Sequence, residues 1–122
     1  MQSAKFYIAG IKFRDKDLIN SVQMGDSIVM VKEPENPHDN LAIAIRRLDP
    51  ESNESDCIGY APKNRNISIG SLMRMPSYVG CVIHKIDRNG SGEVTGIEVR
   101  MDMNADVVVG AEYIDLSQNR LF

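Results

Sequence analysis

The chain contains no tryptophan, only two cysteines and no long hydrophobic run. None of its apolar segments approaches the roughly 20 residues that a membrane-spanning helix needs, so no membrane partner is expected. The first ten residues carry a lysine among alternating polar residues, unlike a signal peptide. Cys57 and Cys81 are too far apart for a CxxC metal site, and two cysteines without an export signal suggest a reducing cytoplasm.

The sequence also lacks the short motifs of common catalytic sites. It has no GxSxG, no HExxH and no glycine-rich loop that would cradle a phosphate. We therefore expect no catalysis and no cofactor. A less favoured alternative is a metal-dependent phosphodiester hydrolase, with Glu33, Glu35, His38 and Asp39 as metal ligands, or with Asp39 joined by Glu33 or Asp102.

The charge balance excludes strong, non-specific binding along a duplex. The 122 residues include 17 acids and 14 bases, which gives a net charge of −3. Four of the acids lie in residues 49–56, so the rest of the chain has 17 − 4 = 13 acids against 14 bases. A generic nucleic-acid coat would be basic. A small pocket that holds one end or a few nucleotides remains compatible with this balance.

Segments rich in aromatic and β-branched residues, some of them alternating, predict about six short strands between Gly/Pro turns, which is typical of a small antiparallel barrel. Asn89-Gly90 is a strong hairpin signal between the last two strands. A helix is predicted after Pro62, over residues 63–75, and a turn or short helix over residues 14–22. The expected strands cover residues 5–13, 27–32, 41–48, 57–61, 78–88 and 93–101.

We expect residues 1–104 to form one mostly β domain and residues 105–122 to form a C-terminal tail. Residues 107–109 could add an edge strand. Residues 111–122 could pack on the barrel or on a second copy of the chain, because several of their side chains are apolar. An alternative function is therefore a protein-interaction or oligomerisation module with no affinity for DNA.

Three segments in the first half stand out together: GIKF at residues 10–13, EPENPHDNLAIAI at residues 33–45 and IGY at residues 58–60. In order and spacing they resemble the HIRAN domain. The resemblance runs from about residue 6 to about residue 101, and EPENPHDNLAIAI is its specific part. It implies an OB-like barrel with a helix, which in DNA-remodelling members captures the 3′ end of single-stranded DNA. It also implies DNA repair as a setting, without the motor domains of larger members.

The resemblance assigns a role to six residues. Lys12 matches a basic position that contacts phosphate, and Phe13 matches an aromatic position that stacks on a base. Asn36 matches a residue that holds the loop or a phosphate, and His38 stands where the family often has a second stacking aromatic. Asp39 matches an acceptor for the terminal 3′ hydroxyl. Tyr60 occupies a His or Tyr position that reaches the DNA backbone.

This chain departs from the family pattern at two of these positions. Lys12 replaces an arginine and loses its bidentate fork for phosphate. His38 offers a smaller stacking surface than tyrosine, and its charge varies with pH. Lys63 adds a further candidate: with Arg65 it places positive charge at a helix start, where a phosphate partner or a solvated face would account for it.

The chemistry of a terminal nucleotide supports this reading without the family. Aromatic platforms bind bases with little sequence preference, and a carboxylate accepts from a hydroxyl but repels a phosphate. Structural alternatives stand beside it. Asn36 and Asp39 are residue types that build Asx turns, and Phe13 could equally be a core residue.

Overall fold

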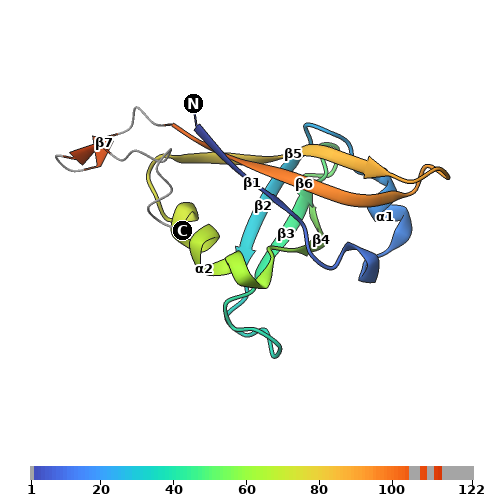
Figure 1. Cartoon of the computed structure of the whole chain (residues 1–122), viewed down its shortest axis with the longest axis horizontal. Helices are drawn as coiled ribbons and strands as arrows, with labels where there is room; N and C mark the ends of the chain where they lie inside the picture. Colours follow the sequence, from blue (N-terminus) through green and yellow to red (C-terminus); the bar gives the residue numbers. More distant parts are fainter. Residues whose placement is uncertain (1, 105–107, 110–111, 114–122) are drawn as a thin grey trace.

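Six of the strands in the computed structural model form one antiparallel sheet, in the order β1-β6-β5-β2-β3-β4 (Figure 1). The structure describes residues 2–104, 108–109 and 112–113. The sheet strands are β1 (Gln2–Tyr7), β2 (Ser27–Lys32), β3 (Ile43–Leu48), β4 (Ser55–Tyr60), β5 (Tyr78–Arg88) and β6 (Val94–Met103). The helical elements are the 3-10 turns η1 (Ile11–Phe13) and η2 (Lys63–Arg65) and the α-helices α1 (Lys16–Ser21) and α2 (Asn66–Met73). The predicted mostly β fold is confirmed.

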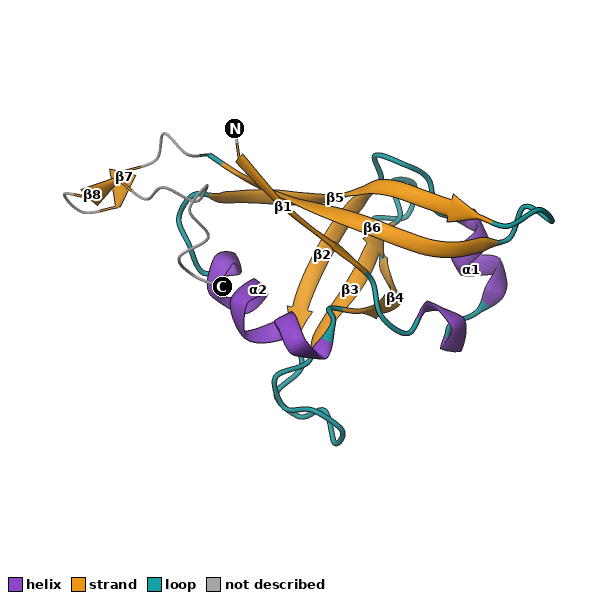
Figure 2. Cartoon of the chain, viewed as in Figure 1, coloured by secondary structure: helices purple, strands orange, loops and turns teal. Residues whose placement is uncertain are grey.

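The sheet curls into a half-barrel, and a bridge between Ala9 and Tyr60 joins its two edges. The Ala9 amide donates to the Tyr60 carbonyl at 2.8 Å, and the Tyr60 amide donates to the Ala9 carbonyl at 2.9 Å. Figure 2 shows β1, β5 and β6 as one layer crossed by β2, β3 and β4, with α1 and α2 at opposite ends. The continuation of β1 therefore meets the end of β4, as the predicted OB-like barrel requires.

Gly59 makes this closure possible. Its φ of +150° is rarely adopted by residues with a side chain, and a Cβ there would lie 2.3 Å from Cγ2 of Ile8 and 2.6 Å from the Ala9 carbonyl oxygen. The glycine of the IGY segment thus lets two backbones approach each other.

The core fills the concave side of the sheet with aliphatic side chains. Alternate residues of β5 and β6 point inward, as their period-two burial shows, and α2 adds Ile69 and Leu72. Among the fully buried large side chains are Ile43, Ile45, Ile58, Ile69, Leu72, Ile83, Ile97 and Met101. A core of this kind leaves the loops and helix starts at the sheet's edges free to form a binding site.

The prediction of one strand over residues 5–13 is wrong beyond Tyr7. Gly10 adopts a left-handed conformation with φ of +78°, and the chain then forms the 3-10 turn η1. An aromatic and β-branched composition favours a strand, but it does not show a glycine that reverses the backbone. Phe13 therefore lies at the end of a turn and is 79% exposed, so it is not a core residue.

Smaller differences concern element ends. The predicted helix over residues 63–75 is divided into η2 and α2, and β4 begins at Ser55, inside the expected acidic turn. The hairpin at Asn89 is present, but Gly92 with φ of +81° takes the left-handed position, and the Asn89 side chain accepts from the amides of Ser91 and Glu93.

The predicted C-terminal tail lies largely outside the described residues. Within it, β7 (Val108–Val109) pairs with β8 (Glu112–Tyr113) in a two-stranded sheet. In the described part of the chain, no helix is long and apolar enough to cross a membrane.

Candidate nucleic-acid interface

The loop between β2 and β3 is held in shape by Asn36. Its Oδ1 accepts from the backbone amides of His38 at 2.9 Å and Asp39 at 3.2 Å, which is an Asx turn. Its Nδ2 donates to Oε1 of Glu33 at 3.0 Å. The structural alternative for Asn36 is therefore present: its amide organises the loop that carries His38 and Asp39.

Asp39 is anchored on both sides. Its Oδ1 accepts from the Leu41 amide at 2.9 Å, and its Oδ2 accepts from Nδ2 of Asn66 at 2.9 Å. Asn66 is the first residue of α2 and is 7% exposed. A carboxylate has about four acceptor sites, so these two bonds leave capacity for a ligand hydroxyl. The loop and the helix together fix the orientation of the Asp39 carboxylate, and so the direction of its remaining acceptor positions.

Tyr60 forms the neighbouring wall. Its hydroxyl donates to Oε1 of Glu33 at 3.0 Å, and burial, followed by this hydrogen bond, raises the pKa of the phenol. Tyr60 is therefore neutral at physiological pH, and its ring is held by the same glutamate that holds Asn36. Because its hydroxyl proton is already engaged, Tyr60 acts mainly as a rigid surface.

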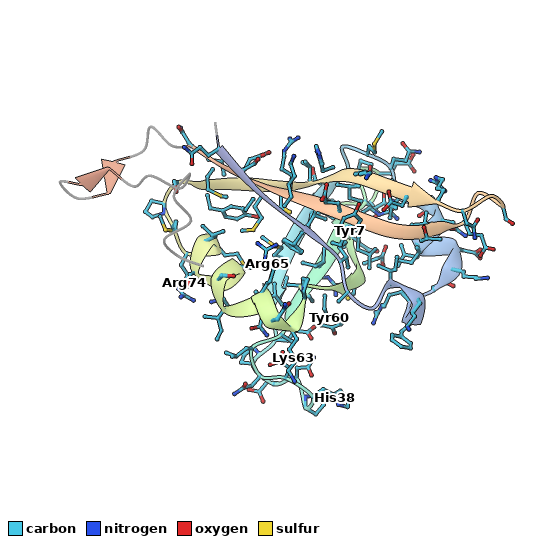
Figure 3. The ribbon with its side chains drawn as sticks, viewed as in Figure 1. Tyr7, His38, Tyr60, Lys63, Arg65 and Arg74 are labelled. Atoms are coloured by element: carbon cyan, nitrogen blue, oxygen red, sulfur yellow. The ribbon has the colours of Figure 1, made fainter. Side chains whose placement is uncertain are left out.

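Asn36, Asp39 and Tyr60 line an open cavity of about 300 Å³. It lies where the loop, the end of β4 and the start of η2 meet, and its volume is at the lower end for small-ligand sites. Figure 3 shows His38, Tyr60 and Lys63 at this end of the molecule. The lining comprises Ala9, Asn36, His38, Asp39, Ala42, Tyr60, Ala61 and Lys63. Five of the seven predicted site residues are thus brought together.

Lys12 and Phe13 lie outside this cavity, on the η1 turn. Nζ of Lys12 lies 5.1 Å from the centroid of the Phe13 ring, a cation–π distance. Lys12 also borders a second hollow of about 310 Å³, together with Arg14 and Lys16. The two parts of the predicted site are close in sequence, because Ala9 lines the first cavity and the η1 turn begins two residues later, at Ile11.

Sequence reasoning missed two supporting residues. Asn66 fixes Asp39, and Glu33 fixes both Asn36 and Tyr60. Glu33 had been considered only as a metal ligand. The local signal for Asn66 is its place at a helix start, where an asparagine side chain often accepts from the first amides of its own helix. In this structure its side chain donates to Asp39 in a distant loop instead.

Residues 2–104 contain no group of three or more His, Cys, Asp or Glu side chains placed to hold a metal ion. Glu33 is engaged by Tyr60 and Asn36, and Asp102 is paired with Arg100 at 2.7 Å. Glu33, Asp39 and Asp102, three of the carboxylates considered for a metal site, therefore serve other contacts.

A curled six-stranded sheet, closed by the Ala9–Tyr60 bridge and with a small cavity beside that bridge, defines a β-barrel domain. The chain belongs to the HIRAN domain family, whose pattern matches residues 1–109.

Two solved structures share the fold. The HIRAN domain of human HLTF aligns with a TM-score of 0.59 and 15% identity, over 83% of this chain and 74% of that one. A protein from Lactobacillus plantarum aligns with a TM-score of 0.53 and 15% identity, over 83% of this chain and 99% of that one. No curated protein matches the chain at the level of sequence.

Proposed function

We propose that this HIRAN domain binds the 3′-hydroxyl end of single-stranded DNA and has no catalytic activity of its own. The observation that carries the proposal is the cavity that holds Asp39 between His38, Tyr60 and Lys63. Membership of a family of DNA-binding modules supports the nucleic acid as the ligand. The chemistry of the cavity supports an end rather than a continuous strand.

Asp39 supplies the selectivity for an end. A carboxylate accepts a hydrogen bond from a hydroxyl, and a bond to a charged group is worth about 1.5–3 kcal/mol. A 3′ phosphate, or the next phosphodiester of a continuous strand, would bring negative charge against the same group. Because Asn66 and the Leu41 amide hold the carboxylate in place, it cannot swing away from that charge without losing both bonds.

Lys63 and His38 complete the contacts with the terminal nucleotide. Lys63 is exposed at the start of η2 and offers a mobile ammonium to the phosphate that precedes the terminal sugar. His38 is exposed at the tip of the loop and offers a flat ring to the base. Tyr60 closes the inner side of the cavity with its own ring.

Phe13 and Lys12 extend the surface beyond the cavity. The exposed Phe13 ring is available for stacking by a second base, and such a contact is worth about 1–3 kcal/mol. Lys12 lies beside that ring and can contact the phosphate between the two nucleotides. The proposed strand therefore enters over η1 and ends at Asp39.

Fluorescence anisotropy with a short single-stranded DNA labelled at its 5′ end tests the proposal. The hydroxyl form and the 3′-phosphate form of the same oligonucleotide are compared at low salt, because the phosphate contacts are salt-dependent. We expect the hydroxyl form to bind about tenfold or more tightly, as one charge-assisted bond predicts. Equal binding of both forms would contradict end recognition by Asp39.

Absence of binding to either form would favour the alternative of a protein-interaction module. Most of the tail on which that alternative depends, residues 105–107, 110–111 and 114–122, lies outside the described residues. The same titration with magnesium added addresses the hydrolase alternative, for which the labelled strand would shorten. We expect it to remain intact.

A further inference from the structure

A third depression, a groove between α2 and the start of β3, lies on the Asn66 side of the Asp39–Asn66 contact. Its volume is about 280 Å³. Its apolar surface comes mainly from Pro34, Leu41 and Ile67, with the buried Ile43 beneath them, and the absence of a side chain at Gly70 deepens it. Leu41 is 52% exposed and Ile67 is 69% exposed, so two large aliphatic side chains face solvent beside one groove. Scattered single apolar residues are common on surfaces, but a lined groove is a mark of a binding site.

Two positive charges, Lys32 and Arg74, lie along the same groove. Neither belongs to an ion pair among the residues that the structure describes. Among the described residues, the guanidinium of Arg74 donates one hydrogen bond, to the hydroxyl of Ser71 at 3.4 Å, and the groove lining contains no carboxylate. Glu33 and Glu35 lie in the neighbouring hollow that Lys32 also borders, but the groove itself contains two cations and no carboxylate. This charge pattern is complementary to an anionic ligand group.

We propose that this groove binds a short peptide segment of a partner protein, in which a large aliphatic side chain is flanked by carboxylates. The aliphatic side chain packs against Leu41 and Ile67, and the carboxylates pair with Lys32 and Arg74. The volume of about 280 Å³ suits one or two side chains rather than a folded element. This pattern of an apolar anchor with a complementary charged rim is the usual anatomy of a peptide site.

The composition of the groove favours a peptide over nucleic acid. Every apolar side chain that lines it is aliphatic or proline, whereas binding of single strands relies on aromatic stacking platforms. The acidic segment of a second copy of the chain, DPESNESD at residues 49–56, has carboxylates but no large apolar residue, so it does not supply the anchor.

The probe for this proposal is a synthetic peptide with two leucines flanked by aspartates, added to the full chain. Amide chemical shifts in two-dimensional NMR report where it binds. We expect progressive shifts at Ile67, Gly70 and Arg74, with little change at His38 and Lys63. Two matched peptides serve as controls, one with asparagine for each aspartate and one with serine for each leucine, and both should bind more weakly.

Substitutions on the groove surface separate its two contributions. Ile67→Ser removes an exposed anchor contact and should weaken the peptide about tenfold or more, since burying such a side chain is worth about 1.5–3 kcal/mol. Lys32→Gln with Arg74→Gln should remove most of the salt dependence. The matched control is Val79→Ser, because Val79 is 56% exposed on β5 and does not line the groove.

Absence of shifts at the groove with the peptide at about 2 mM would overturn the proposal, since that concentration detects binding as weak as about −4 kcal/mol. Shifts at Gly70 and Arg74 caused by single-stranded DNA instead would assign the groove to nucleic acid and would equally overturn it. This test is independent of the 3′-end proposal. Peptide binding is detected at Ile67, Gly70 and Arg74, whereas DNA binding is detected at His38 and Lys63, so either can be observed without the other.

Discussion

Oδ2 of Asp39 accepts a hydrogen bond at 2.9 Å from Nδ2 of Asn66, a residue 27 positions further along the chain. This contact ties the loop after β2 to the first turn of α2. Asp39 lines the cavity proposed to bind the DNA end, and Asn66 lines the groove proposed to bind a peptide, so the contact lies between the two. Both proposed sites therefore depend on the placement of one polar pair.

Asn66→Ala is expected to destabilise the chain and to loosen Asp39. The substitution removes a buried donor and leaves one carboxylate oxygen without its partner, which costs about 1–3 kcal/mol. Urea denaturation measures the loss. The control is Asn64→Ala, at an exposed position in η2, and an equal loss in both variants would contradict a special role for the contact.

Asp39→Asn is expected to abolish the preference for a 3′ hydroxyl over a 3′ phosphate. Asparagine keeps the shape and removes the charge that repels phosphate, but its amide NH2 cannot accept, so one of the bonds from Leu41 and Asn66 is also lost. Binding of the hydroxyl form should weaken, while binding of the phosphate form should stay the same or improve. The anisotropy comparison checks this expectation, and an equal loss for both forms would indicate a purely structural role in the loop.

Phe13→Ala is expected to weaken both end forms without affecting folding. The ring is 79% exposed, so its removal should change the free energy of unfolding by less than about 0.5 kcal/mol. Loss of a stacked base should reduce DNA affinity by about 1–3 kcal/mol. Met24→Ala is the matched control, because Met24 is 68% exposed and does not line the cavity. Unchanged affinity in Phe13→Ala would remove Phe13 from the DNA path.

Gly59→Ala is expected to be severely destabilising. The new Cβ would lie within 2.6 Å of the Ala9 carbonyl oxygen and would be held at an unfavourable φ, so we expect a loss of about 2–5 kcal/mol from overpacking and strain combined. Gly80→Ala, where a Cβ would meet no atom within 4 Å, should be close to neutral. Similar denaturation curves for the two variants would contradict the close approach at Gly59.

Cys81 is expected to make stability fall at alkaline pH. Burial, reinforced by Asp102, raises the pKa of its thiol from 9.0 to about 12. The unfolded chain then loses this proton first as pH rises, so the contribution is complete below pH 9 and is lost between pH 9 and about pH 12. The slope is at most about 1.4 kcal/mol per pH unit.

Denaturation curves across this pH range check the expectation for Cys81. Cys81→Ala should flatten the alkaline decline, whereas Cys57→Ala should leave it unchanged, because Cys57 is only half-buried. Alkylation with iodoacetamide supplies a second readout. The folded chain should be modified at Cys57 well before Cys81, and equal rates would show that Cys81 is not shielded.

The sequence predicts most of the sheet because alternation and composition are local signals. The strand at residues 94–103 shows alternation clearly, whereas residues 27–32 and 78–88 are recognisable from their aliphatic and β-branched composition. The loop between residues 33 and 40 is recognisable from its Pro and Asn content. The sequence predicts one strand over residues 5–13, but the strand ends at Tyr7. Composition does not show that Gly10 adopts a left-handed conformation, which redirects the chain.

The sequence predicts most of the residues that line the cavity, but it does not predict the contacts that hold them in place. The HIRAN-like motif supplied His38, Asp39 and Tyr60, which do line one cavity. Periodicity could not show whether Phe13 is buried or exposed, because Phe13 follows the end of the strand. The contact between Asp39 and Asn66 depends on tertiary packing of two segments, and no local pattern encodes such a pair.

The closure of the barrel between Ala9 and Tyr60 consists of one reciprocal pair of backbone hydrogen bonds, and both residues also line the end-binding cavity. A seam this short has little resistance to local opening compared with the long β5–β6 ladder. A ligand that contacts both sides of it holds the seam shut. Ligand binding in the cavity should consequently slow hydrogen exchange at the amides of Ala9 and Tyr60, so these two amides report on whether the cavity is occupied.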